Sequence, residues 1–303
     1  MSPDSPLVRV EGRQLKLSNL DKVLYPDAGF AKRDVIDYYV AVADAMLPHL
    51  RERPVTLRRY PDGVSGQSFF EKNAARHAPD WVRTVRIATP GSSTGSPYAD
   101  FAVIEDLPTL VWAANLAALE LHVPQWTVGP RGGERTPDLL VFDLDPGEPA
   151  DIVECCRVAE LIRELLEADR LTAYPKTSGS KGMQLYVPVR VSSTERPSVY
   201  AKDIAERLAR DHPELVVSVM AKAARPGKVF VDWSQNSPKK TTVAPYSLRG
   251  RPHPTASTPL RWAEVEACRA ADDLRFTGDE VRRRVEGDGD LFDVRDGHRP
   301  LPR

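Results

Sequence analysis

The chain has 303 residues, 41% hydrophobic and 28% charged, which excludes a disordered protein and allows a sizeable core. A formal net charge of −1 neither indicates nor excludes nucleic-acid binding, because a protein that is nearly neutral as a whole can still carry a local basic surface. The sequence has no long apolar run and no secretory N-terminus, and its three cysteines, two adjacent and one distant, form neither a disulfide framework nor a zinc pattern. These features predict a cytoplasmic protein with reduced thiols and no membrane span.

The first half of the chain shows alternating helical and extended patterns. Apolar spacing predicts a helix over 33–50, a short extended run over 54–60 and a second helix over 107–121. Segments 88–99 and 128–137 are rich in Gly, Pro and polar residues and are expected to be loops.

The second half alternates strand and helix patterns more regularly. We expect strands over 139–144, 171–176, 183–189 and 228–233, helices over 151–168 and 197–210, and 241–246 as a neighbour of the last strand. Two short helical patterns and a polar tail follow residue 250. These elements predict an α/β (α+β) fold with a mixed or antiparallel central sheet packed by helices.

Carboxylates follow two of the predicted strands. Asp143 and Asp145 end the run Leu-Leu-Val-Phe-Asp-Leu-Asp, and Asp232 ends Val-Phe-Val-Asp. Residues two apart on a strand share a face, and clustered carboxylates suit divalent ions that promote phosphoryl transfer. Solvated strand ends, a nucleotide-sugar transferase and a phosphohydrolase with an Asp-x-Asp strand are alternative interpretations. Gly147, in place of the usual Thr, disfavours the phosphohydrolase.

A Thr-Ser-Gly-Ser-Lys-Gly turn at 177–182 separates two predicted strands. Its glycines let the backbone approach phosphate oxygens, and its hydroxyls and Lys181 can donate to them. The spacing is not that of a Walker loop. Arg249 follows a later extended run, and its planar guanidinium suits a triphosphate.

Seven segments, in order, resemble the polymerase domain of bacterial end-joining ligase D, a member of the archaeo-eukaryotic primase superfamily. They are 17–26, 69–72, 121–126, 141–147, 177–182, 229–236 and 244–249. The resemblance covers roughly residues 14–290 and implies a primase-polymerase fold. We therefore expect a single domain over 1–303, with a DNA-end-binding lobe over about 1–134, a catalytic core over 135–250 and a C-terminal helical segment over 251–303.

The resemblance assigns roles to residues of the predicted catalytic core. It implies that Asp143, Asp145 and Asp232 are catalytic and bind two Mn²⁺ or Mg²⁺ ions. It further implies that the nucleotide is bound by His122, near the sugar, by Gln235, and by the phosphate-binding residues Ser178, Gly179, Lys181 and Arg249.

The resemblance also implies a site for a DNA end. Asn19, Lys22 and Lys32 match positions that hold a terminal 5'-phosphate, which carries more charge than a diester. Phe69 and Phe70 match aromatic residues that stack on template bases without sequence preference. Further backbone contacts are expected from Arg59, Lys72 and Arg76.

One position departs from the family pattern. The motif that contains the Lys-Gly turn commonly ends in His, and here the residue is Gln184. Glutamine can donate a hydrogen bond to a phosphate, so we still expect Gln184 to bind the nucleotide. It carries no positive charge and cannot act as a proton donor at neutral pH. We expect an active enzyme with a reduced rate.

The resemblance implies a DNA-end-directed nucleotidyltransferase that adds nucleotides, with a preference for ribonucleotides, to 3'-hydroxyl ends at gaps and breaks during non-homologous end joining. Implied partners are DNA ends with a 5'-phosphate, nucleoside triphosphates, Ku protein and a DNA ligase module, in the bacterial cytoplasm at the nucleoid. A catalytically weak DNA-end-binding or bridging module is the alternative outside enzymology, and an Asp-x-Asp phosphohydrolase is the rival enzyme.

Overall fold

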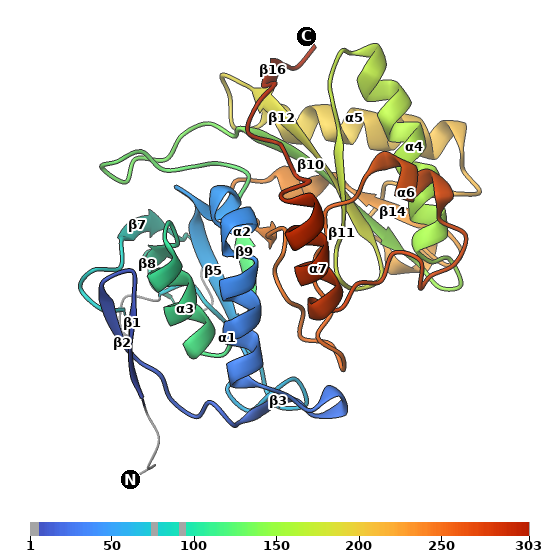
Figure 1. Ribbon diagram of the computed structural model, residues 1–303. Helices are drawn as coiled ribbons and strands as arrows, with labels where there is room; N and C mark the ends of the chain where they lie inside the picture. The colour runs from blue at the N-terminus through green and yellow to red at the C-terminus, as the bar shows by residue number, and fades with distance from the viewer. Residues whose placement is uncertain (1–5, 74–77, 91–94, 303) are drawn as a thin grey trace.

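The computed structural model describes residues 6–73, 78–90 and 95–302, and these form two lobes, each built on a six-stranded sheet (Figure 1). In the first sheet the order is β15-β9-β5-β8-β7, with β6 also paired to β5, and every pairing is antiparallel. Its strands are β5 (Pro54–Arg59), β6 (Phe69–Glu71), β7 (Thr84–Ala88), β8 (Tyr98–Val103), β9 (Ala118–Val123) and β15 (Thr242–Val243).

Helices cover one face of this first sheet, and no helix of the described part of the chain covers the opposite face (Figure 1). They are α1 (Lys32–Ala41), α2 (Ala43–Leu50) and α3 (Leu107–Asn115). The helix predicted over 33–50 is therefore two helices, separated at Val42, whose φ of −98° and ψ of 4° leave the helical region. Pro48 weakens a continuous helix further, because it has no N–H to donate.

The predicted helix over 107–121 is wrong in its last third. The helix α3 ends at Asn115, and Ala117 takes a left-handed φ of 56° that turns the chain into β9. In β9 the side chains alternate: Leu119 and Leu121 join the core under the helices, while Glu120 lies on the opposite face. Tertiary packing on both faces of β9 overrides the helical spacing.

The second sheet has the order β11-β12-β10-β14-β13, with β16 also paired to β12. Its strands are β10 (Leu139–Pro146), β11 (Tyr174–Thr177), β12 (Met183–Arg190), β13 (Val216–Val217), β14 (Val229–Asp232) and β16 (Arg299–Pro300). The pairings β13–β14 and β12–β16 are parallel and the others antiparallel. This confirms the predicted mixed α+β fold.

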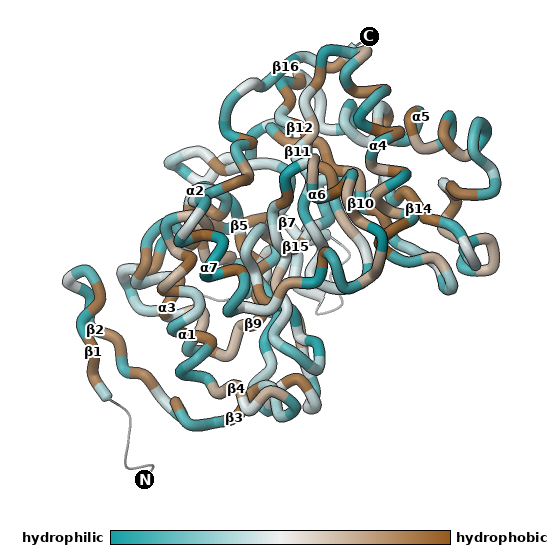
Figure 2. The backbone as a smooth tube through the Cα atoms, turned by 45° about the vertical axis from the view of Figure 1, so that its right-hand side comes forward, coloured by the Kyte–Doolittle hydropathy of each residue, from teal (hydrophilic) through white to brown (hydrophobic). Residues whose placement is uncertain are grey.

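Two long helices, α4 (Ile152–Ala168) and α5 (Arg196–Asp211), pack with the short α6 (Trp262–Ala267) on the second sheet and enclose its core. The central strands β10 and β14 are hydrophobic over most of their length (Figure 2). Because they are buried on both faces, their carboxylates appear only where the strands end. No helix of the described residues is long and apolar enough to cross a membrane.

The chain returns from the second lobe to the first through β15, so the predicted pairing of 241–246 with the strand at 228–233 is wrong. A short 3₁₀ helix (Trp233–Asn236) turns the chain away from β14. The buried Asn236 stabilises this turn, because its side chain accepts from Val141 N at 2.8 Å and donates to Val141 O at 2.7 Å. Residue Thr242 then pairs with Val123 of β9.

The remaining elements complete the first lobe. Hairpins β1 (Leu7–Val10) with β2 (Arg13–Lys16) and β3 (Val23–Tyr25) with β4 (Phe30–Ala31) precede α1. Near the other end of the chain, α7 (Gly278–Asp288) contributes Val281 to the first core and contacts α1. The C-terminal segment therefore packs against both lobes (Figure 1).

Candidate functional site

The three aspartates lie side by side at one edge of the second sheet. Asp143 and Asp145 occupy alternate positions of β10, and the register of β14 places Asp232 directly opposite Asp143. Burial and the charge of Asp145 raise the pKa of Asp143 to about 7, and burial and the charge of Asp232 raise the pKa of Asp145. The site is therefore short of positive charge, as a cation-binding site is before its ion arrives.

Carboxylate oxygens are the donors that Mg²⁺ and Mn²⁺ prefer, so these residues fit the implied ions. Within 6–73, 78–90 and 95–302, no three histidine, cysteine or acidic side chains already converge in metal-binding geometry. Local donors hold the carboxylates instead: Ser234 N (3.0 Å) and Gln235 Nε2 (2.9 Å) donate to Asp232, and Gln184 Nε2 donates to Asp143 Oδ1 at 3.0 Å. Metal binding by the three aspartates stays a prediction.

The predicted phosphate loop, 177–182, packs directly against this edge of the sheet. A Cβ on Gly182 would lie 2.0 Å from Leu144 O, so only glycine lets the loop meet β10 between the two aspartates. Gly179 takes a φ of 68°, and a Cβ there would lie 2.6 Å from Ala256 C. Both glycines are therefore required by close backbone approach.

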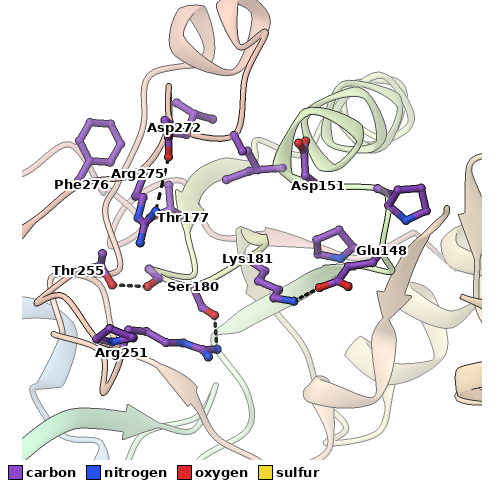
Figure 3. Close-up of a pocket in the computed structure, with 18 residues that line it drawn as sticks. Glu148, Asp151, Thr177, Ser180, Lys181, Arg251, Thr255, Asp272, Arg275 and Phe276 are labelled. Atoms are coloured by element: carbon purple, nitrogen blue, oxygen red, sulfur yellow. Dashed lines mark hydrogen bonds and ion pairs between the residues drawn. The ribbon is translucent and has the colours of Figure 1, made fainter. Parts of the chain in front are cut away.

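The side chains of the loop are tied to neighbouring segments (Figure 3). Ser178 Oγ accepts from the backbone N–H groups of Ser180 and Gly182 at 3.2 and 3.3 Å, which fixes the turn. Ser180 accepts from Arg251, while the exposed Lys181 donates to Glu148 at 2.5 Å. Lys181 can be released to an anion at low cost, because an exposed ion pair contributes little to stability.

Arg249 joins the phosphate loop to the first lobe. Its Nη1 donates to Ser178 O at 2.6 Å, and its Nε lies 3.4 Å from Glu120 Oε2 without forming a hydrogen bond. This N–H group is buried, so a bound anion would satisfy it. The predicted nucleotide-binding residues Ser178 and Arg249 are thus in direct contact.

Glu120 is a buried carboxylate that the sequence analysis missed. It accepts from Tyr60 OH (2.8 Å), His122 Nε2 (2.9 Å), Gly250 N (3.0 Å) and Arg58 Nη1 (3.2 Å). Burial would raise its pKa, but the hydrogen bond from His122 and the charge of Arg249 hold the pKa of Glu120 well below its usual range. The sequence offered one indication of this role, which is that Glu120 lies two residues before His122.

His122 lies in the same cluster, on the face of the first sheet that the helices leave uncovered. Burial lowers the pKa of His122, although Glu120 partly opposes the shift. The ring of Phe70 meets the imidazole edge to face at 5.5 Å between centroids, and Arg58 lies over Phe70 at 5.2 Å. Phe70, which is 57% exposed, therefore lies on the same face of the sheet as His122 and Glu120.

Phe69 points the other way, because adjacent residues of a strand alternate between faces. It pairs with Arg59, whose guanidinium lies 5.4 Å from the ring and donates to Glu71 at 2.8 Å. The two phenylalanines therefore contact different surfaces. Lys72 is exposed beside them, and Arg76 lies outside the described residues.

The predicted 5'-phosphate residues are brought together by the β3–β4 hairpin. Lys22 precedes β3 and Lys32 follows β4, and Lys32 N donates to Lys22 O at 2.9 Å. Exposed Asn19 takes a left-handed φ of 52° and its carbonyl accepts from Lys22 N. Burial, with the nearby charges of Arg59 and Lys22, lowers the pKa of Lys32 to about 8. We call Asn19, Lys22, Lys32 and Arg59 the basic patch.

The family model described as "LigD, primase-polymerase domain" matches residues 31–292 of the chain. The chain belongs to the LigD primase-polymerase family. It is 45% identical over 295 residues to the multifunctional non-homologous end joining DNA repair protein LigD of Mycobacterium tuberculosis, covering 95% of this chain and 38% of that protein. It is 35% identical over 281 residues to the bifunctional LigD of Bacillus subtilis, covering 92% of the chain and 44% of the relative.

A solved structure agrees with this family assignment. The chain superposes with a TM-score of 0.84 on the polymerase domain of Mycobacterium tuberculosis ligase D in complex with DNA, at 45% identity, covering 91% of this chain and 96% of that one. The chain thus spans less than half the length of these curated relatives and nearly all of the solved domain. The family resemblance and primase-polymerase fold expected from the sequence are confirmed.

Proposed function

We propose that this LigD primase-polymerase chain is a metal-dependent nucleotidyltransferase that extends 3'-hydroxyl ends of DNA at gaps and breaks during non-homologous end joining. One observation carries the proposal: Asp143, Asp145 and Asp232 meet on adjacent strands, beside a loop whose glycines press against the same edge. Ribonucleotide preference, Ku and a ligase module as partners, and action at the bacterial nucleoid are further parts of the proposal.

The residues of the site have separate tasks in this reaction. Divalent ions bound by the aspartates would neutralise the triphosphate and promote attack on its α-phosphorus. Ser178 and Arg249, which are joined by a 2.6 Å hydrogen bond, would both bind the phosphates of the nucleotide. Lys181 would join them after its ion pair with Glu148 breaks. His122 and Gln235 would border the nucleotide, since they hydrogen-bond Glu120 and Asp232 at the two sides of the site.

The basic patch would bind the downstream 5'-phosphate. The nearby charges of Arg59 and Lys22 disfavour the charge of Lys32, and a phosphate dianion would relieve that repulsion. The solved relative is described as in complex with DNA, which supports a DNA-binding role for this chain.

The experiment is extension of a labelled primer on gapped DNA that carries a 5'-phosphate, with Mn²⁺ or Mg²⁺ and with ribo- or deoxynucleotides. Incorporation with release of pyrophosphate is the expected result, strongest with ribonucleotides and Mn²⁺. Tight, phosphate-dependent binding without incorporation would instead establish an end-binding module. Release of inorganic phosphate through an acyl-phosphate at Asp143 would establish a phosphohydrolase.

The lowered pKa of Lys32 predicts pH-sensitive recognition of the 5'-phosphate. A phosphate prefers the protonated amine, so its binding advantage over a 5'-hydroxyl end falls as pH rises through about 8. Between pH 7 and pH 9 we expect this advantage to fall by roughly tenfold, as one pKa unit implies. Fluorescence anisotropy with both DNA ends measures it. In Lys32→Met the advantage should be small and flat across this range, and a wild-type advantage that is constant to pH 9 would contradict the assignment.

The opposite orientations of the two phenylalanines predict separable defects. Phe70→Ala should impair nucleotide insertion by roughly tenfold, because one stacking contact contributes about 1–3 kcal/mol, with little change in binding to 5'-phosphorylated DNA. Phe69→Ala, the matched control from the opposite face, should weaken DNA-end binding more than insertion, because it packs on Arg59 of the basic patch. Steady-state insertion kinetics and anisotropy distinguish them, and identical defects would refute separate surfaces.

A further inference from the structure

Lys176 is a fully buried lysine that reaches Asp143 through Gln184, and the proposed reaction assigns it no role. It lies on β11, and the register of the sheet aligns it with Gln184 of β12, which in turn lies opposite Asp143 of β10. A row of lysine, glutamine and aspartate thus crosses three adjacent strands. Burying an amine is costly unless its hydrogen bonds are complete, so this lysine requires an explanation.

The contacts of Lys176 indicate its charge state. Its Nζ lies 2.6 Å from Ser257 Oγ, 2.7 Å from Gln184 Oε1 and 3.0 Å from Val243 O. Ser257 Oγ donates its own hydrogen to Thr177 O at 2.8 Å, so towards the lysine it accepts. Burial and the charge of Arg249 lower the pKa of Lys176 well below its usual range. The three acceptors around Nζ nevertheless require three N–H donors, and only the ammonium form has them.

The same contacts determine how the amide of Gln184 is oriented. Its Oε1 accepts from Lys176, so its Nε2 faces Asp143 Oδ1 at 3.0 Å. A flipped amide would place its oxygen against the carboxylate and its NH₂ group against the ammonium, which is unfavourable on both sides. Lys176 therefore holds the amide in the orientation that donates to Asp143.

We propose that Lys176 and Gln184 form a positioning pair that replaces the histidine of the family motif, with Lys176 supplying the positive charge and Gln184 the hydrogen bond to Asp143. This inference rests on the proposed polymerase function. A single histidine combines a charge and a donor in one ring, whereas here the two properties are divided between adjacent strands. In this proposal the pair acts through the orientation of Asp143, in place of the phosphate contact that the sequence led us to expect of Gln184.

Each member of the pair therefore makes a distinct prediction. Gln184→Glu keeps an acceptor for Lys176 but places a carboxylate against Asp143. It should remain folded and lose at least tenfold in the insertion rate, with nucleotide KM unchanged. Lys176→Met removes the charge and frees the amide to flip, and it should also lower the rate rather than raise KM.

A double-mutant cycle supplies the decisive test. Gln184→His alone places an imidazole next to the buried ammonium of Lys176, and it should lower both the insertion rate and the stability of the protein. In the Lys176→Met background the same histidine has space and no opposing charge, so Gln184→His should raise the rate at least tenfold and cost less stability. The four proteins are compared by single-turnover insertion and by urea unfolding in metal-free buffer.

The two measurements separate failure of this inference from failure of the proposed function. Additive effects in both activity and unfolding would overturn the pair, as would full activity of Gln184→Glu. If the wild-type chain incorporates nothing, the polymerase function fails. The unfolding cycle in metal-free buffer then still decides whether Lys176 and Gln184 are coupled: an equal cost of Gln184→His in both backgrounds would refute the pair.

Discussion

Asp143→Asn should abolish nucleotide incorporation, by about 10³-fold or more, because the divalent ions that we propose for this site would lose a central carboxylate. The substitution keeps the size of the side chain and leaves the strand pairing of β10 intact. Binding of 5'-phosphorylated DNA should change little, since the basic patch lies in the other lobe. Primer extension and anisotropy on the same preparation check both parts. Incorporation at the wild-type rate would show that the site is wrongly assigned.

The same variant should be more stable than the wild type in metal-free buffer at neutral to alkaline pH. The pKa of Asp143 is raised to about 7, so the folded protein retains a proton that the unfolded chain releases, and wild-type stability falls as pH rises from about 4 to 7. Asparagine does not titrate. Its advantage should therefore be small near pH 4 and reach about 4 kcal/mol above pH 7, since the pKa of Asp143 is raised from 3.8 to about 7 and each pKa unit corresponds to about 1.4 kcal/mol.

Urea unfolding at pH 5 and pH 8 measures this difference, with Asp203→Asn on the exposed face of α5 as the matched control. The control should show no comparable gain. A loss of stability in Asp143→Asn at pH 8 would mean that the three carboxylates do not repel one another.

Glu120→Ala should have the largest effect on both stability and activity among the residues outside the aspartates. Removing a buried carboxylate leaves Arg249 and Arg58 without their shared counter-charge, and breaking such a pair costs about 3–5 kcal/mol. Incorporation should fall by at least about a hundredfold, because His122 and Arg249 lose their common anchor at once.

Urea unfolding and single-turnover insertion test this prediction, and Glu120→Gln is the matched control. Glutamine retains the shape and one acceptor oxygen but not the charge, so its defects should be intermediate. If Glu120→Ala unfolds at the same urea concentration as the wild type, Glu120 does not organise the site.

The positions of the aspartates could be predicted from the sequence because they depend on local pattern. An apolar strand that is buried on both faces accommodates charge only at its end, and residues two apart share a face, so Asp143, Asp145 and Asp232 were recognisable before any coordinates. The glycines of the phosphate loop were recognisable for a similar reason, since close backbone approach permits no other residue. The predicted DNA-end residues came from the family resemblance alone, because an isolated lysine or phenylalanine gives no sign of such a role.

The wrong predictions concern segments whose secondary structure or strand pairing depends on residues far away in the sequence. Residues 118–121 have helical spacing, yet they form β9 because layers from both sides bury them. Residues 242–243 follow β14 in the chain, yet they pair with β9, because the Asn236 turn directs them to the other lobe.

The sequence by itself determined the fold class, the strand-end carboxylates and the family, since each is a property of local spacing or of ordered motifs. Only the tertiary structure decided how charge is balanced around the site. Glu120 meets Arg249, and Lys176 meets Ser257, across 129 and 81 positions of the chain. Such pairs leave no local signature, because a buried charge is stabilised by whichever partner the fold brings to it.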